Sequence, residues 1–145
     1  MANNSASSAN DALPLDITDP SAQRNPVRVL IVDDLVDAAD SLALLLRRLG
    51  YEVQATYDGA SALRVAAEFV PQAILLDLAL PKLDGFQIAA RLRQETALQN
   101  MCLIALSGYG QADDVARTRS AGFDFHLLKP VNFEDLLRLL DDCGR

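Results

Sequence analysis

The sequence has few cysteines, no cluster of basic residues and no long hydrophobic run. Its two cysteines, Cys102 and Cys143, do not indicate a disulfide scaffold. We expect inert packing or spare surface thiols, as suits a reducing cytosol. The net charge of −7 without a Lys/Arg cluster argues against a nucleic-acid surface. No apolar run approaches the roughly 20 residues that cross a bilayer, so we expect no membrane span.

The N-terminal segment also lacks a basic leader followed by an apolar stretch, which argues against a secretory signal. Residues 1–26 are rich in Asn, Ser, Ala, Asp and Pro and follow no helical or strand period. They are predicted to be a disordered leader. Residues 27–145 are predicted to form one cytoplasmic domain, because a 50% hydrophobic content is enough for a core.

Apolar residues are organised in five short runs that alternate with helical periods. The runs cover 27–32, 52–56, 73–76, 102–106 and 123–128. Four are nearly continuously apolar, as in strands covered on both faces, and the more polar 52–56 is typical of an edge. This alternation predicts an α/β fold with helices on both faces of a five-stranded parallel sheet. We expect the doubly wound, flavodoxin-like (βα)5 arrangement with strand order 2-1-3-4-5.

Polar and charged residues follow four of these predicted strands. Asp33 and Asp34 end the first run, Asp77 the third, Ser107 the fourth and Lys129 the fifth. Because parallel strands end at one edge of the sheet, these residues should meet in one crevice, where α/β proteins bind ligands. The crevice would contain three carboxylates, a hydroxyl and an ammonium group.

Three carboxylates in one crevice are costly unless a cation offsets their charge. Aspartate is also common as a helix cap, and we assign Asp58, Asp84 and Asp113 to that role. The three carboxylates in the crevice are better explained by a bound Mg²⁺ ion, which takes carboxylate oxygens as ligands. Because Mg²⁺ usually binds phosphate oxygens too, phosphoryl chemistry is the first hypothesis. Lys129 would then neutralise a phosphoryl oxygen and Ser107 donate a hydrogen bond to it. The simpler alternatives are a lysine snorkelling at a strand end and a serine in a turn.

Four motifs lie at the predicted strand ends: LIVDD, ILLDLALPKLDG, ALSG and LLKP. Together they resemble those of the receiver domain of two-component response regulators, in particular the single-domain, chemotaxis-regulator-like kind, and the resemblance runs from about 27 to 143. It implies that Asp77 is phosphorylated by a histidine kinase or a histidine-phosphotransfer protein. Lys129 would contact the phosphoryl group, with a cis bond to Pro130. It further implies a Mg²⁺ or Mn²⁺ site formed by Asp33, Asp34, Asp77 and the backbone carbonyl of Ala79.

The resemblance also implies a switch. In the family, the residue at the position of Ser107 moves towards the phosphoryl group. An aromatic residue at the position of His126 then follows that residue inward. A half-buried strand residue is the alternative for His126. Since histidine changes charge near neutral pH, a pH-dependent switch is a further hypothesis.

Three residues depart from the family pattern. Leu35 replaces a frequent polar residue and would affect which partner docks. Ala79 stands where side chains tune dephosphorylation, and the bulky Tyr109 would gate the site.

Several functions are compatible with such a domain. We expect a stand-alone regulator in phosphorelay signalling that is not an enzyme beyond its own phosphorylation and dephosphorylation. Its downstream partner would bind the surface formed by the fourth helix, around 112–116, the strand at 123–128 and the final helix, around 133–140. A phosphorelay intermediate, or a receiver from a hybrid histidine kinase, is the alternative. A phosphorylation-independent interaction module is a remote one.

Two other functional classes do not fit the sequence. A nucleotide- or flavin-binding protein needs a Gly/Ser/Thr-rich loop after the first strand, where this chain has DDLVD. An aspartyl phosphohydrolase needs a second acid/base carboxylate near its nucleophile, and Asp77-Leu78-Ala79 offers none.

Overall fold

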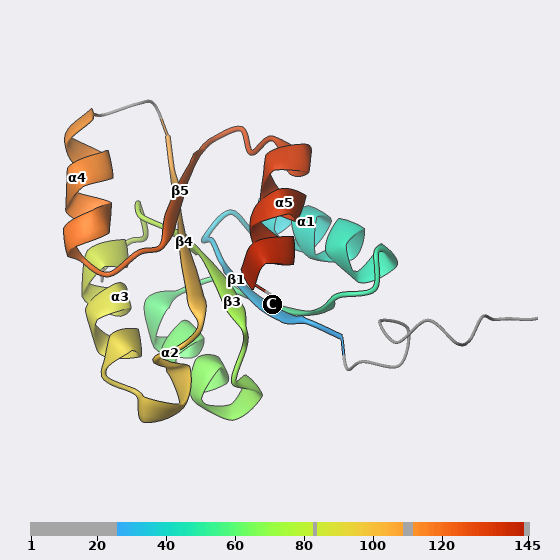
Figure 1. Ribbon diagram of the computed structural model, residues 1–145, viewed down its shortest axis with the longest axis horizontal. Helices are drawn as coiled ribbons and strands as arrows, with labels where there is room; N and C mark the ends of the chain where they lie inside the picture. Colours follow the sequence, from blue (N-terminus) through green and yellow to red (C-terminus); the bar gives the residue numbers. More distant parts are fainter. Residues whose placement is uncertain (1–25, 83, 109–111, 144–145) are drawn as a thin grey trace, which may run out of the picture.

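The computed structural model describes residues 26–82, 84–108 and 112–143 (Figure 1). Residues 1–25 of the predicted leader, and Tyr109 with its predicted gating role, lie outside the described residues. Within the described part, no helix is both long enough and apolar enough to cross a membrane.

The described chain alternates strand and helix five times, as predicted. The strands are β1 (Arg28–Val32), β2 (Glu52–Thr56), β3 (Ala73–Asp77), β4 (Cys102–Ser107) and β5 (Phe125–Leu128). The helices are α1 (Val36–Arg48), α2 (Gly59–Phe69), α3 (Gly85–Arg93), α4 (Ala112–Ser120) and α5 (Phe133–Cys143), with a 3₁₀ turn, η2 (Thr96–Leu98). All strand pairs are parallel and the order is β2-β1-β3-β4-β5. The flavodoxin-like fold is therefore confirmed, with β2 at an edge.

Two hydrophobic cores lie on opposite faces of the sheet. Side chains alternate along each strand, so Leu30 and Val32 of β1 face one core while Val29 and Ile31 face the other. Helices α2, α3 and α4 cover the first face, and α1 and α5 cover the second (Figure 1). Because both faces are covered, the central strands are buried, which accounts for their continuous apolar runs.

The helices begin and end largely where the sequence predicts. The carboxylate of Asp58 accepts a hydrogen bond from the Ser61 N–H at 2.7 Å and caps α2. This bond lowers the pKa of Asp58 below its ordinary value. Asp84 caps α3 through a reciprocal capping box with Gln87. The predicted cap Asp113 is wrong, because α4 already begins at Ala112 and Asp113 lies inside its first turn.

The expectation for the two cysteines is also wrong. Cys102 and Cys143 form a disulfide, with their Cα atoms 5.6 Å apart. The helices of a parallel α/β fold run back against the strands, so the last residue of α5 returns to the edge where β4 begins. The fold thereby brings together two cysteines that are separated by 41 positions in sequence.

Candidate functional site

The predicted site residues meet at the carboxyl edge of the sheet. Asp33 follows β1, Asp77 ends β3, Ser107 ends β4 and Lys129 follows β5. The parallel register places these strand ends at one level, with Asp77 opposite Leu106 and Ser107 opposite Leu128. The Lys129 N–H donates to the Ser107 carbonyl at 2.8 Å, which extends the pairing of β4 and β5 into the site.

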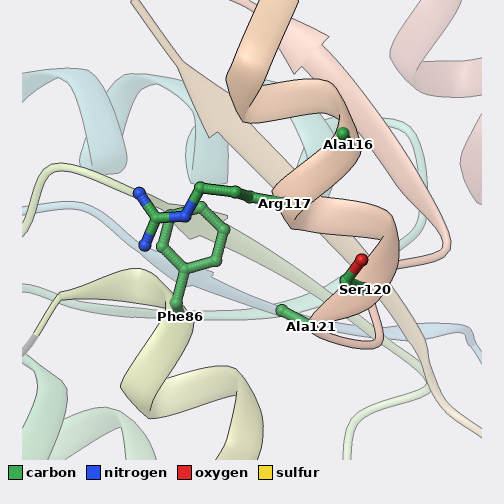
Figure 2. Close-up of a pocket in the computed structure, with 5 residues that line it drawn as sticks. All are labelled: Phe86, Ala116, Arg117, Ser120 and Ala121. Carbon is green, nitrogen blue, oxygen red and sulfur yellow. The ribbon is translucent and has the colours of Figure 1, made fainter.

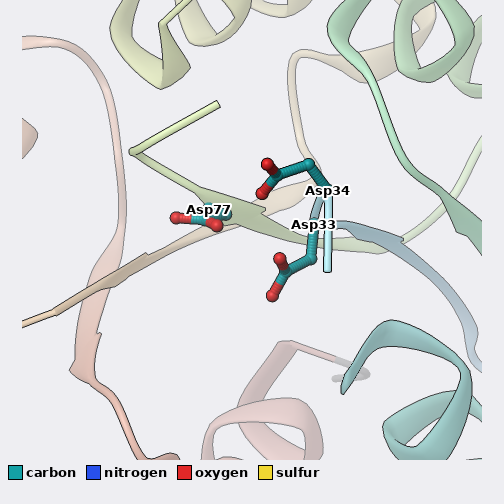
Figure 3. Close-up of side chains that lie close together, drawn as sticks. All are labelled: Asp33, Asp34 and Asp77. Atoms are coloured by element: carbon teal, nitrogen blue, oxygen red, sulfur yellow. The ribbon is translucent and has the colours of Figure 1, made fainter. Parts of the chain in front are cut away.

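Three carboxylates converge at this edge, as Figure 3 shows. Asp33, Asp34 and Asp77 each offer one oxygen, and these oxygens lie within 4.8 Å of one another. Asp33 and Asp77 are each only 4% exposed, whereas Asp34 is exposed to solvent. Two of the three like charges are thus largely removed from water, which is unfavourable without a compensating cation.

Lys129 supplies part of that compensation. Its Nζ lies 3.1 Å from Asp33 Oδ2 and 3.0 Å from Asp77 Oδ2, and it forms ion pairs with both. The predicted approach of Lys129 to the carboxylates is present, and its bond to Pro130 is cis.

Backbone N–H groups orient the two buried carboxylates. Asp33 Oδ1 accepts a hydrogen bond from the Leu35 N–H at 3.0 Å. Asp77 Oδ1 accepts one from the Ala79 N–H, also at 3.0 Å. In each carboxylate one oxygen is bound to its own loop and the other faces Lys129, so both side chains have a defined direction.

Burial and neighbouring charges shift the pKa values of Asp77 and Lys129. Burial raises the pKa of Asp77 and the charge of Asp33 adds to this, although the Ala79 N–H and Lys129 oppose it. Burial disfavours the charged form of Lys129, but its hydrogen bonds and charge interactions with Asp77 and Asp33 prevail and raise its pKa. Asp77 therefore needs more positive charge than Lys129 provides to ionise as readily as an ordinary aspartate.

The donor set fits a hard divalent cation. Carboxylate oxygens are ligands that Mg²⁺ and Mn²⁺ prefer, and the spacing of the three oxygens allows one ion to contact all of them. Exposed Asp34 leaves this side of the cluster open to water, which Mg²⁺ retains in most protein sites.

A series of hydrogen-bonded side chains leads away from the carboxylates. Ser107 Oγ lies 2.5 Å from His126 Nε2, and Thr118 Oγ1 of α4 lies 3.4 Å from His126 Nδ1. Ser107 is 5% exposed, and His126 is partly buried. The imidazole of His126 therefore links the site to α4. Thr118 belongs to this series of hydrogen-bonded side chains, and the sequence analysis did not include it.

A family model described as the response regulator receiver domain matches residues 29–141. The chain belongs to the response regulator receiver family.

Two curated relatives differ in how much of their own length the receiver covers. The receiver is 36% identical to the DNA-binding dual master transcriptional regulator RpaA of Synechocystis sp. over 110 residues, which are 76% of this chain and 46% of RpaA. The chain thus spans about half the length of that relative. It is 32% identical to Protein PilG of Pseudomonas aeruginosa over 115 residues, which are 79% of this chain and 85% of PilG.

A solved structure has the same fold as the receiver. The chemotaxis protein CheY4 of Vibrio cholerae aligns with a TM-score of 0.77 and 26% sequence identity. The alignment covers 81% of this chain and 98% of that one.

A groove between α3 and α4 lies apart from the carboxylates. It has a volume of about 400 Å³ and is lined by Phe86, Ala116, Arg117, Ser120 and Ala121 (Figure 2). The Arg117 guanidinium lies 4.0 Å from the centre of the Phe86 ring, in a cation–π contact. Among the described residues, none of the predicted site residues of the receiver lines this groove, so the groove belongs to the α3–α4 contact rather than to the carboxylate site.

Gly85 is a residue of the receiver site whose importance the sequence analysis missed. A Cβ at this position would lie 2.8 Å from the Leu78 Cα and 3.0 Å from the Asp77 carbonyl oxygen. Its N–H also donates to the Leu78 carbonyl at 3.2 Å. The start of α3 therefore packs directly on the loop that positions Asp77, and only glycine allows this approach.

We expect Gly85→Ala to lower the free energy of unfolding of the receiver by about 1–3 kcal/mol, because the backbone of Leu78 must move. Gly108→Ala is the matched control. A Cβ there meets nothing within 4 Å, so its effect should stay within about 0.5 kcal/mol. Urea unfolding of both variants measures the difference. Equal stabilities would contradict the packing role of Gly85.

Proposed function

We propose that this receiver accepts a phosphoryl group on Asp77 from the phosphohistidine of a histidine kinase or a histidine-phosphotransfer protein. The observation that supports this most strongly is the pairing of two buried carboxylates, Asp33 and Asp77, with one Lys129 ammonium group. With a divalent cation held by the carboxylates, this ammonium group would offset the negative charge of a transferred phosphoryl group.

The proposed reaction is an in-line displacement at phosphorus. An oxygen of Asp77 attacks, the phosphorus–nitrogen bond of phosphohistidine breaks, and its electron pair returns to the imidazole nitrogen. The product is an aspartyl phosphate. Lys129 lies close enough to move from the carboxylates to a phosphoryl oxygen.

Mg²⁺ or Mn²⁺ would be held by Asp33, Asp34, Asp77 and the backbone carbonyl of Ala79. The ion would supply charge neutralisation for the transferred group. The receiver would have no enzymatic activity beyond its own phosphorylation and dephosphorylation.

Phosphorylation would be transmitted through Ser107 and His126. We propose that Ser107 binds a phosphoryl oxygen and that His126 follows the serine inward. The contacts of Ser107 with His126 and of His126 with Thr118 support this role. The affected surface would be formed by α4, β5 and α5, where a downstream protein binds.

The receiver would act as a stand-alone cytoplasmic protein. The supporting comparison is PilG, of which the chain covers 85%. A phosphorelay intermediate, or a receiver within a hybrid kinase, is the second candidate, because the chain covers only part of longer relatives such as RpaA. Leu35 is 60% exposed beside the carboxylates, and we propose that it helps to select the protein that docks there.

Asp77→Ala should abolish labelling by acetyl phosphate or phosphoramidate in the presence of Mg²⁺, because the nucleophile is removed. The measurement is a mass increase of one phosphoryl group, located by peptide mapping. Asp84→Asn is the control, since Asn retains the cap of α3 and Asp84 is not among the clustered carboxylates. Absence of labelling of the unaltered protein in Mg²⁺, or full labelling of Asp77→Ala, would contradict the proposal.

A further inference from the structure

The disulfide connects two elements with different roles. Cys102 is the first residue of β4, whose last residue is Ser107, and Cys143 is the last residue of α5. The bond therefore lies at the amino edge of the sheet, opposite the edge where the carboxylates converge. Both cysteines are partly buried against the α1/α5 core and retain some exposure to solvent.

Helix α5 forms one wall of a surface groove. The groove has a volume of about 260 Å³, and its lining residues include Phe125 and His126 of β5 and Asp135, Arg138 and Leu139 of α5. On its inner side α5 is attached by the fully buried Leu136 and Leu140. The disulfide adds a covalent attachment at the end of the helix, one turn beyond Leu140.

We propose that Cys102 and Cys143 form a reversible thiol–disulfide exchange site, through which low-molecular-weight thiols and disulfides control the attachment of α5. This inference goes beyond phosphorylation, because it involves neither Asp77 nor the cation site. Reduction would free the end of α5 and loosen one wall of the groove, whereas oxidation would fix it.

The disulfide forms in two exchange steps. In the oxidising direction, a thiolate from one of the two cysteines attacks a small-molecule disulfide and forms a mixed disulfide, releasing one small thiol. The second cysteine then displaces the other small thiol and closes the Cys102–Cys143 bond. The two cysteines lose two protons and two electrons in total, and the small-molecule disulfide is reduced to two thiols. The reverse reaction consumes two thiols.

Two features support reversibility rather than a permanent structural bond. The two cysteine residues are partly exposed, as exchange with a small thiol requires. The core contacts of Leu136 and Leu140 do not depend on the disulfide, so α5 should stay folded against the sheet after reduction. The two redox states would then be two folded states that differ at the end of one helix.

Hydrogen exchange of the full chain tests the proposal in oxidised glutathione and, separately, in dithiothreitol. Amides near the end of α5 should exchange on the order of tenfold faster after reduction through local opening, whereas those of β1 and β3 should remain among the most protected, because they exchange only when the whole domain unfolds. The melting temperature should fall by roughly 10 °C, because the Cys102–Cys143 disulfide no longer restricts the unfolded chain. Cys143→Ser and Cys102→Ser should match the reduced protein in both conditions.

Thiol counting by mass spectrometry completes the experiment. Both thiols should disappear together in oxidised glutathione, within a monomer, and reappear in dithiothreitol under native conditions. Free thiols that persist in oxidised glutathione would overturn the proposal, as would a bond that dithiothreitol reduces only after unfolding. Equal exchange of α5 in the two redox states would also overturn it.

Discussion

The structure depends on the balance between three clustered carboxylates and the cations that offset them. Asp33 and Asp77 are buried at the ends of β1 and β3, and Lys129 lies about equally close to both. Burial raises the pKa of Asp77 even with Lys129 beside it, so the single ammonium does not fully compensate the site. That residual negative charge accounts for the fit of a divalent cation, and it favours a reaction that proceeds with such a cation bound.

The fold maintains this unfavourable cluster through rigid elements. The strands that end in Asp33 and Asp77 are central and buried on both faces, so they cannot separate to relieve the repulsion. Gly85 lets α3 pack against the loop that follows Asp77, and the Leu35 and Ala79 N–H groups orient the carboxylates. The packing of the sheet thus stabilises an arrangement that would be costly by itself.

Much of this arrangement could be predicted from the sequence, because the apolar periods determine the strand ends. Asp33, Asp77 and Lys129 meet since parallel strands end at one edge. The need for glycine at 85 could not be predicted, because it arises from the approach of the Leu78 backbone. The disulfide was missed although a signal existed. In the predicted fold a helix end and a strand start share an edge, and each contains a cysteine.

A titration with paramagnetic Mn²⁺ shows whether the three carboxylates bind one divalent cation, because electron paramagnetic resonance counts the bound ions. One Mn²⁺ should bind per chain. The affinity should be roughly tenfold or more weaker for Asp34→Asn, which removes a charged ligand at an exposed position. Asp58→Asn, which retains the cap of α2, should bind like the unaltered protein. Equal binding by Asp34→Asn and the unaltered chain would mean that the clustered carboxylates do not hold the ion.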